Sequence, residues 1–408
     1  MKAVAVRRGG LLHALVALLP AWFAWAGSVA VIGWLVFVAT RSPALVGVAF
    51  AVRAAPLVLV GLPIGTLSDR LGRILVLQIA NLGTAVIFAS LALLAASGLL
   101  SFELVIAAGA ALGLFDAGRM VCGNNLMFEL AGELGPTKAI AASNFAGAIG
   151  QIAGGALTGA ALNFSGPPVA CAIVAASSLA SAILLFGLPD HANARHERGT
   201  PFVAAVREGL ALLHRLPAIG LLIAAACVVE MFAFSCMALD PSFAGQVFMA
   251  GPVGLGWILA SRALGRLVGA SALLLLPARR VVGRALALSV IGFGLALLIY
   301  AVAPVLALAL PFIFIVGITS LVIDALVLTA VQAGVHATAR GRAAGLWVLM
   351  IGLQPIGVLE VGLVAQVAGA RWAQGINSSI VIVFGMAMLL TAFGRRIRDM
   401  ETVGSQAG

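Results

Sequence analysis

The chain has 408 residues, of which 62% are hydrophobic and 9% are charged, and its mean hydropathy is +1.16. A soluble domain of this length cannot bury so much apolar surface, so the composition excludes a soluble globular protein and indicates a membrane protein. The net charge of +10 does not indicate nucleic-acid binding, because 18 of the 24 Lys and Arg residues fall in segments expected to be cytoplasmic. This distribution is the positive-inside rule.

Twelve apolar runs of roughly 20–27 residues follow one another, and each is long enough to cross about 30 Å of hydrocarbon. The first run continues to about Ala39, beyond a signal-peptide core of about 7–15 residues, so we expect it to be retained as a helix. The predicted spans are 12–38, 44–66, 74–96, 102–125, 139–163, 168–188, 216–238, 252–276, 284–304, 308–331, 343–367 and 372–394.

The turn after the second run carries the most specific pattern in the chain. It contains Gly61, Gly65, Asp69, Arg70, Gly72 and Arg73. Gly65 permits close helix approach, and Gly72 suits a turn conformation that a Cβ would strain. The carboxylate is expected to cap the next helix or to pair with a cation, while the two arginines keep the turn cytoplasmic. The turn is therefore either a topological anchor or a latch that holds one conformation.

This pattern resembles the loop signature of the major facilitator superfamily, although Ile74 replaces the family's final basic residue. The resemblance implies an all-α polytopic membrane protein, with twelve transmembrane helices in two pseudo-symmetric six-helix bundles. A weak internal repeat supports this duplication at an offset of 203 residues. Four positions recur, Gln151, Gly154, Gly159 and Gly166, as Gln354, Gly357, Gly362 and Gly369.

The longest polar interruption divides the chain between these expected halves. It includes an amphipathic stretch at 202–213, which predicts a helix on the inner membrane face. We therefore predict an N-terminal half at 1–188, a cytoplasmic linker at 189–215 and a C-terminal half with a short cytoplasmic tail at 216–408.

Three stretches look like the superfamily branch that contains the enterobactin exporter and related secretion transporters. They are Arg53-Ala-Ala-Pro56, the linker helix at 202–216, and Gly341 to Trp347 leading into Gln354-Pro-Ile-Gly357. A further stretch, Gly150-Gln-Ile-Ala-Gly154-Gly155, resembles an antiporter motif of the superfamily, with Gln151 in place of its proline. Close helix packing explains these small residues equally well.

Eight ionisable residues fall inside the predicted spans, where each costs about 2.5–3.5 kcal/mol on insertion scales and so needs a reason. They are Asp116, Glu230, Asp324, Glu360, Arg53, Arg119, Arg262 and Arg266. Equal numbers of each sign favour neutral pairs, and Asp116 shares a helix face with Arg119. Glu230 lies near mid-span without a local partner, so it is either the partner of Arg262 or a proton carrier.

We rank Glu230 first and Asp116 second as the proton-coupling group, with Asp324 as a further candidate. The residues expected to line a substrate cavity are Arg53, Arg119, Gln151, Arg262 and Gln354. No Cys or His spacing suggests a disulfide or a metal site, and we expect no cofactor.

These features predict a secondary active transporter of the bacterial cytoplasmic membrane, monomeric and with both termini cytoplasmic. No ATP-binding loop is present, so an ion gradient, most simply of protons, is expected to drive export of a small organic molecule such as a siderophore or a hydrophobic toxic compound. The alternatives are an uptake carrier of the same fold and a non-transporting sensor or assembly protein. An enzyme is the weakest interpretation, because no nucleophile–base pair is apparent.

Overall fold

The computed structural model describes residues 2–130, 136–188, 226–275, 282–333 and 352–390. Within these residues the chain is helical almost throughout and contains no β-strand. Nine of the described helices are long and apolar enough to cross a membrane, and two shorter apolar helices, Pro43–Leu57 and Gln354–Ala368, accompany them. A helix satisfies its own backbone polar groups, as a span in lipid requires. The predicted all-α polytopic fold is confirmed.

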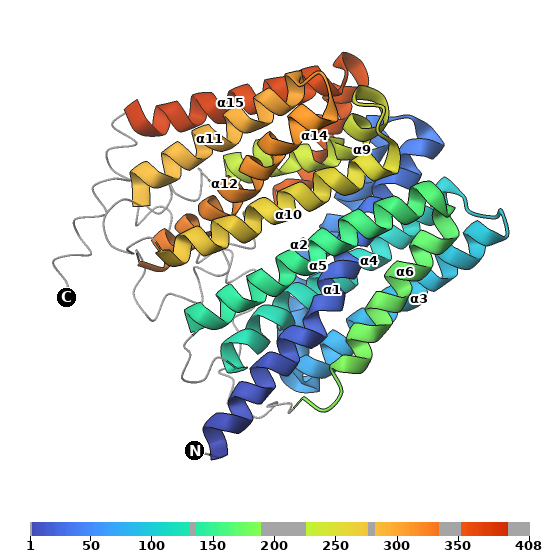
Figure 1. The fold of residues 1–408 in the computed structure, drawn as a ribbon, viewed down its shortest axis with the longest axis vertical. Coiled ribbons are helices and arrows are strands. Elements are labelled where there is room, and N and C mark those ends of the chain that lie inside the picture. The colour runs from blue at the N-terminus through green and yellow to red at the C-terminus, as the bar shows by residue number, and fades with distance from the viewer. Residues whose placement is uncertain (1, 131–135, 189–225, 276–281, 334–351, 391–408) are drawn as a thin grey trace.

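The first six helices form one bundle, drawn in blue to green in Figure 1. Their bounds are α1 (Lys2–Thr40), α2 (Pro43–Leu71), α3 (Arg73–Ala96), α4 (Phe102–Leu130), α5 (Pro136–Phe164) and α6 (Gly166–Leu184). Helix α1 packs against α5 and α6, while α2 packs against α4 and α3 against α6. Each helix overlaps the corresponding predicted span.

The remaining helices form the second bundle, drawn in yellow to red in Figure 1. It begins with an irregular span, Ala226–Val247, which we call the broken helix. The regular helices that follow are α10 (Gly251–Leu275), α11 (Val282–Val302), α12 (Leu306–Ala333), α14 (Gln354–Ala368) and α15 (Ala370–Leu390). Helix α10 packs against α12, and α11 packs against both α12 and α15. The linker predicted at 189–215 lies outside the described residues.

The broken helix departs from α-helical geometry along most of its length. A π-helical turn, η2 (Val229–Ala233), leads into a 3₁₀ segment, η3 (Phe234–Leu239). One α-helical turn, α9 (Asp240–Ser242), and a second π-helical turn, η4 (Phe243–Val247), complete it. The predicted span, 216–238, ended too early. Asp240 and Pro241 lie beyond that predicted end, yet the proline lies in the first turn of α9 and the aspartate is neutralised inside the protein.

Two glycines close the tight turns between consecutive helices. Gly72 joins α2 to α3 with φ 90°, and its amide donates to the carbonyl oxygen of Ser68 at 3.0 Å. Gly369 joins α14 to α15 with φ 89°. A side chain is strained at such positive φ values, which explains why glycine occupies both positions.

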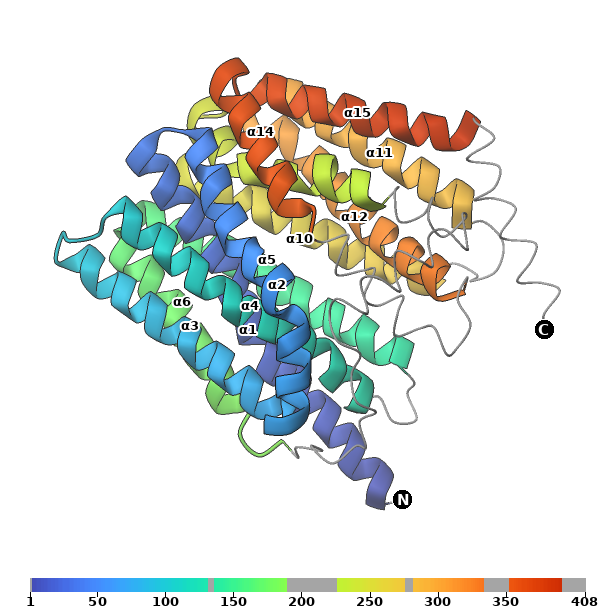
Figure 2. The same ribbon diagram turned by 180° about the vertical axis from the view of Figure 1, so that it is seen from behind.

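The two bundles touch at the end of the molecule that contains the 40–43 and 368–370 turns, which we call the distal end. Figure 2 shows α14 beside α2 there. A Cβ added to Gly47 of α2 would lie 2.8 Å from the carbonyl oxygen of Val358 on α14. Likewise, a Cβ added to Gly256 of α10 would lie 2.7 Å from the carbonyl oxygen of Gly155 on α5. Glycine therefore sets both crossings between the bundles.

Two hydrogen bonds reinforce this distal contact. The Ser42 hydroxyl donates to Gln366 Oε1 at 2.7 Å, and Gln246 Nε2 donates to the carbonyl oxygen of Arg41 at 3.4 Å. Each bond joins a residue of the first bundle to one of the second. The first residues of α1 and the last of α15 lie at the opposite end (Figure 1).

Candidate functional site

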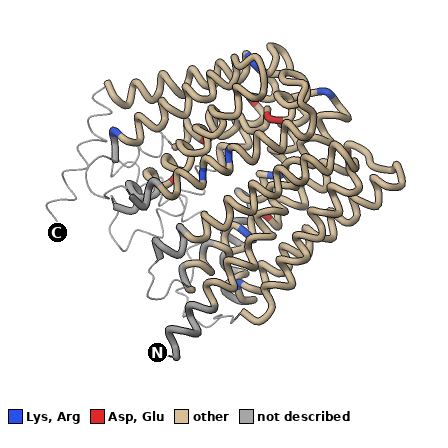
Figure 3. The backbone as a smooth tube through the Cα atoms, in the orientation of Figure 1, with Lys and Arg blue, Asp and Glu red and all other residues tan. Residues whose placement is uncertain are grey.

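Few charged residues occur along the described helices, as Figure 3 shows. Those inside the membrane spans form separate clusters, one in the first bundle and others in the second. Because isolated charges are costly in a bilayer, the partner of each one indicates what it does.

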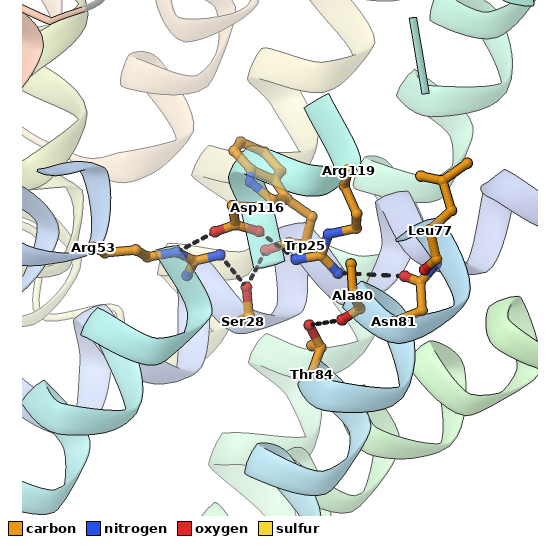
Figure 4. Close-up of polar contacts among 9 residues, drawn as sticks. All are labelled: Trp25, Ser28, Arg53, Leu77, Ala80, Asn81, Thr84, Asp116 and Arg119. Atoms are coloured by element: carbon orange, nitrogen blue, oxygen red, sulfur yellow. Dashed lines mark hydrogen bonds and ion pairs between the residues drawn. The ribbon is translucent and has the colours of Figure 1, made fainter. Parts of the chain in front are cut away.

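The first cluster joins three helices of the N-terminal bundle around Asp116 (Figure 4). Arg53 Nε of α2 donates to Asp116 Oδ2 of α4 at 2.8 Å. Arg119, one turn further along α4, donates to Asp116 Oδ1. Sequence spacing predicted the contact within α4, but not the one from α2. Two arginines share one carboxylate, so this cluster carries an excess positive charge.

Polar side chains that the sequence analysis did not single out hold these arginines in place. Arg53 Nη2 donates to the Ser28 hydroxyl of α1 at 2.8 Å, and that hydroxyl donates to the Trp25 carbonyl oxygen at 2.6 Å. On the other side, Arg119 Nη1 reaches Asn81 Oδ1 of α3 at 3.5 Å (Figure 4). The cluster therefore ties α1, α2, α3 and α4 together. Arg53 is only 6% exposed, which makes it a poor lining residue in this conformation.

In the second bundle, Arg262 pairs with Asp240 and not with Glu230, so that predicted pairing is wrong. Arg262 Nη1 and Nη2 donate to the two carboxylate oxygens of Asp240 at 2.6 and 3.0 Å. Asp240 was expected outside the membrane, yet it is buried in the broken helix. Asp240 and Arg262 are 22 residues apart, on consecutive spans. The predicted span ended at residue 238, so Asp240 was not considered as a partner of Arg262.

Arg266, one turn beyond Arg262 on α10, pairs more loosely with Asp324 of α12. Its Nη1 and Nη2 both lie 3.4 Å from Asp324 Oδ2, and both side chains are 30% exposed. Glu230 interacts electrostatically with Arg266 and Asp324, but forms no hydrogen bond or ion pair with any described residue. The result is a partly exposed group with two carboxylates and one cation.

A further polar group lies where α14 and α15 pack against the broken helix. Asn377 Nδ2 of α15 donates to Glu360 Oε2 of α14 at 3.0 Å. Gln374, one turn before Asn377, uses its Nε2 to reach the Ser378 hydroxyl at 3.4 Å. Glu360 was among the predicted intramembrane charges, and neither amide was predicted.

The two glutamines predicted to line a cavity are half-buried, and neither forms a hydrogen bond within the described residues. Gln151 lies on α5 between glycines that pack on α1, and Gln354 is the first residue of α14. In the predicted latch, the helix continues to Leu71. The surroundings of Gly61 and Gly65 and the side chains of Asp69 and Arg70 lie outside the described part.

No group of three or more His, Cys, Asp or Glu side chains within the described residues is arranged to hold a metal ion. The four cysteines Cys122, Cys171, Cys227 and Cys236 form no disulfide within the described residues and are buried or half-buried. The described spans therefore contain ion pairs and hydrogen-bonding groups inside a two-bundle helical membrane protein, an arrangement typical of membrane transport proteins.

A comparison with protein families identifies the superfamily within this class of membrane transport proteins. The family model of the Major Facilitator Superfamily matches residues 14–357, and the chain belongs to this superfamily. A search of curated proteins finds no match.

Solved transporter structures share the fold at low sequence identity. A mutant of the nucleoside transporter NupG matches with a TM-score of 0.75 and 14% identity over 95% of this chain and 99% of that chain. The human organic anion transporter MFSD10 (TETRAN) matches with a TM-score of 0.65 and 18% identity over 93% and 99%. A bacterial homolog of the human lysosomal transporter Spinster, in an inward-facing conformation, matches with a TM-score of 0.59 and 15% identity over 98% and 94%.

Proposed function

We propose that this protein is a secondary active transporter that exports a small organic molecule in exchange for protons by alternating access. The two bundles meet at the distal end through glycine crossings and two hydrogen bonds. At these crossings backbone meets backbone, so the helices can part there without withdrawing long side chains from one another. This supports a cycle in which each bundle moves as a body and the distal end alternately closes and opens.

The observation that carries the coupling proposal is the position of Glu230 beside the Arg266–Asp324 pair. That pair is long, at 3.4 Å, and partly exposed, whereas the buried Arg262–Asp240 pair is short, at 2.6 Å. Arg266 is therefore the cation that can change partners. When Glu230 is protonated, Arg266 stays with Asp324; when Glu230 ionises, it competes for the guanidinium. Proton occupancy thereby becomes a change in contacts between the broken helix and α10.

The other parts of the proposal come from the sequence. The domain division is 1–188, 189–215 and 216–408, with both termini in the cytoplasm and the protein in a bacterial inner membrane as a monomer. Resemblance to the secretion branch supports export. The turn around Asp69 acts as the latch on the cytoplasmic side. Asp116, held by two arginines, ranks behind Glu230 as the proton carrier.

The test is transport in proteoliposomes loaded with a pH-sensitive dye and given an imposed pH gradient. The substrate panel contains nucleosides, organic anions and hydrophobic cations, because two of these classes are named for proteins of the same fold. Proton flux that depends on one substrate, with that substrate moving against its gradient, is the expected result. Absence of flux with every class favours the non-transporting alternative, and accumulation in the same direction as proton flow favours uptake.

Glu230→Gln, a permanent mimic of the protonated acid, is expected to abolish pH-driven accumulation while keeping substrate exchange. Glu103→Gln is the matched control, because Glu103 is exposed in the first turn of α4 and should retain both activities. If the Glu230→Gln protein still concentrates substrate with an unchanged pH dependence, Glu230 does not carry the coupled proton.

A further inference from the structure

We infer that the C-terminal bundle contains a binding site for a small monovalent cation, with Na⁺ as the probe, between Glu360 and the amides of Asn377 and Gln374. The inference does not depend on the direction of transport or on Glu230. It begins from the close packing of α14 on the broken helix.

Gly357 makes this packing possible. A Cβ added there would lie 2.0 Å from the carbonyl oxygen of Met231, so α14 rests directly on the backbone of η2. Glu360 follows three residues later and therefore lies on nearly the same face of α14. Helix α15 packs on η2 and η3 as well. The carboxylate is thus held at the place where the broken helix departs from α-helical geometry, and π-helical turns of this kind are frequent at functional sites.

Two amide oxygens at this place are buried without a hydrogen-bond donor among the described residues. They are Asn377 Oδ1 and Gln374 Oε1, on side chains that are 1% and 0% exposed. Each amide nitrogen is already used, by Glu360 and by Ser378 respectively. A buried acceptor without a partner is costly, so both oxygens require a donor or a cation.

The charge balance calls for a cation of charge +1. Arg262 neutralises Asp240, and Arg266 is engaged by Asp324. Glu360 forms no ion pair with any described residue, and its described hydrogen bond comes from a neutral amide. In the proposed site, the Glu360 carboxylate and the two amide oxygens would supply an all-oxygen ligand set, which suits a hard cation. In transporters, broken membrane helices commonly contribute to such cation sites.

Cys236 lies near both this group and the Asp240–Arg262 pair. Its thiol donates to the carbonyl oxygen of Phe232 at 3.1 Å and interacts with Gln374, Asn377 and both carboxylates. A thiol is a weak donor without charge, so Cys236 does not neutralise the Glu360 carboxylate.

The test is thermal unfolding of the purified full-length protein in NaCl against choline chloride at equal concentration. A ligand that binds only the folded state stabilises it by RT ln(1 + [L]/Kd), so the Tm rises with the logarithm of the free ligand concentration once this exceeds Kd. A rise in Tm that grows with NaCl concentration and is absent in choline chloride is expected for the wild type. Glu360→Gln should fold and lose this rise, and Gln374→Leu should need more Na⁺ for the same rise. Ser379→Ala, on the neighbouring residue that faces away and bonds its own helix backbone, should behave as the wild type.

Equal Tm values in both salts for the wild type would overturn the inference and indicate buried water as the partner of the two amides. A full NaCl response in Glu360→Gln would overturn it as well. If that variant does not fold, direct binding of radioactive Na⁺ to the wild type and to Gln374→Leu decides the matter. Saturable binding that weakens in Gln374→Leu supports the site, and absence of saturable binding to the wild type overturns it.

Discussion

The buried ion pair between Asp240 and Arg262 shows what a single charge costs in this protein. Both residues are nearly inaccessible, and both guanidinium nitrogens at the end of Arg262 are used by one carboxylate. Removing one member leaves the other charge buried and unpaired, which typically costs about 3–5 kcal/mol. The pair therefore fixes the α9 part of the broken helix to α10.

Asp240→Asn is accordingly expected to be strongly destabilised, by about 3–5 kcal/mol, because it leaves the Arg262 charge uncompensated. The double variant Asp240→Asn, Arg262→Gln removes both charges and should recover part of the loss. Thermal unfolding of the detergent-solubilised proteins measures both effects. A double variant less stable than Asp240→Asn alone would show that Arg262 is held by other groups.

At the scale of single residues, sequence reasoning identified which charges matter but not how they pair. Asp116 and Arg119 were predictable because they lie on one helix face three residues apart. The contacts of Arg53 with Asp116 and of Arg262 with Asp240 depend on the depth and rotation of separate helices, which no local pattern encodes. Asp240 was missed because the predicted span ended at residue 238, whereas the observed span continues to Val247.

The helical elements themselves were predictable, because length and hydropathy are strong signals in a membrane chain. The irregularity of the broken helix was not, since its residues carry no marker of π-helical or 3₁₀ geometry. Packing imposes this geometry: α14 approaches to backbone contact at Gly357, and Gly245 accommodates the Phe37 ring of α1, which lies 2.2 Å from where a Cβ would stand. The crossing of α5 and α10 at Gly155, Gly159 and Gly256 is a second feature of this kind.

Gly256→Ala tests whether that crossing holds the distal end closed. The added methyl group would meet the backbone of α5 at Gly155, which cannot rotate away as a side chain can. Overpacking of this kind costs about 1–3 kcal/mol. If only the distally closed state bears the cost, the equilibrium shifts about 5- to 150-fold toward the open state.

A cysteine placed at Ser42, inside the distal contact, reports this shift through its rate of labelling by a membrane-impermeant thiol reagent. Gly123→Ala on α4 is the matched control, because a Cβ there meets nothing within 4 Å. Labelling at the same rate in the Gly256→Ala and Gly123→Ala proteins would mean that the α5–α10 crossing does not limit opening.

At the scale of the whole molecule, the two bundles are joined at the distal end by residues from both halves of the chain. Arg41 and Ser42 follow α1, Gln246 ends the broken helix, and Gln366 lies in the last turn of α14. A transporter that alternates must separate these residues once in every cycle. The Ser42–Gln366 contact is therefore the point where a covalent bridge has the greatest effect.

A protein carrying Ser42→Cys and Gln366→Cys is expected to react with a short bifunctional thiol reagent and to lose transport, because the bridge holds the distal end closed. The hydroxyl and amide oxygens of the native residues lie 2.7 Å apart, so the two thiols are within reach of such a reagent. Each single-cysteine variant should keep its activity under the same treatment, and cleavage of a reducible linker should restore transport in the double variant. Substrate present on the distal side should slow the cross-linking if it favours the open state. Full activity in the cross-linked protein would mean that the bundles do not separate at this contact, and the alternating-access proposal for the distal end would then be wrong.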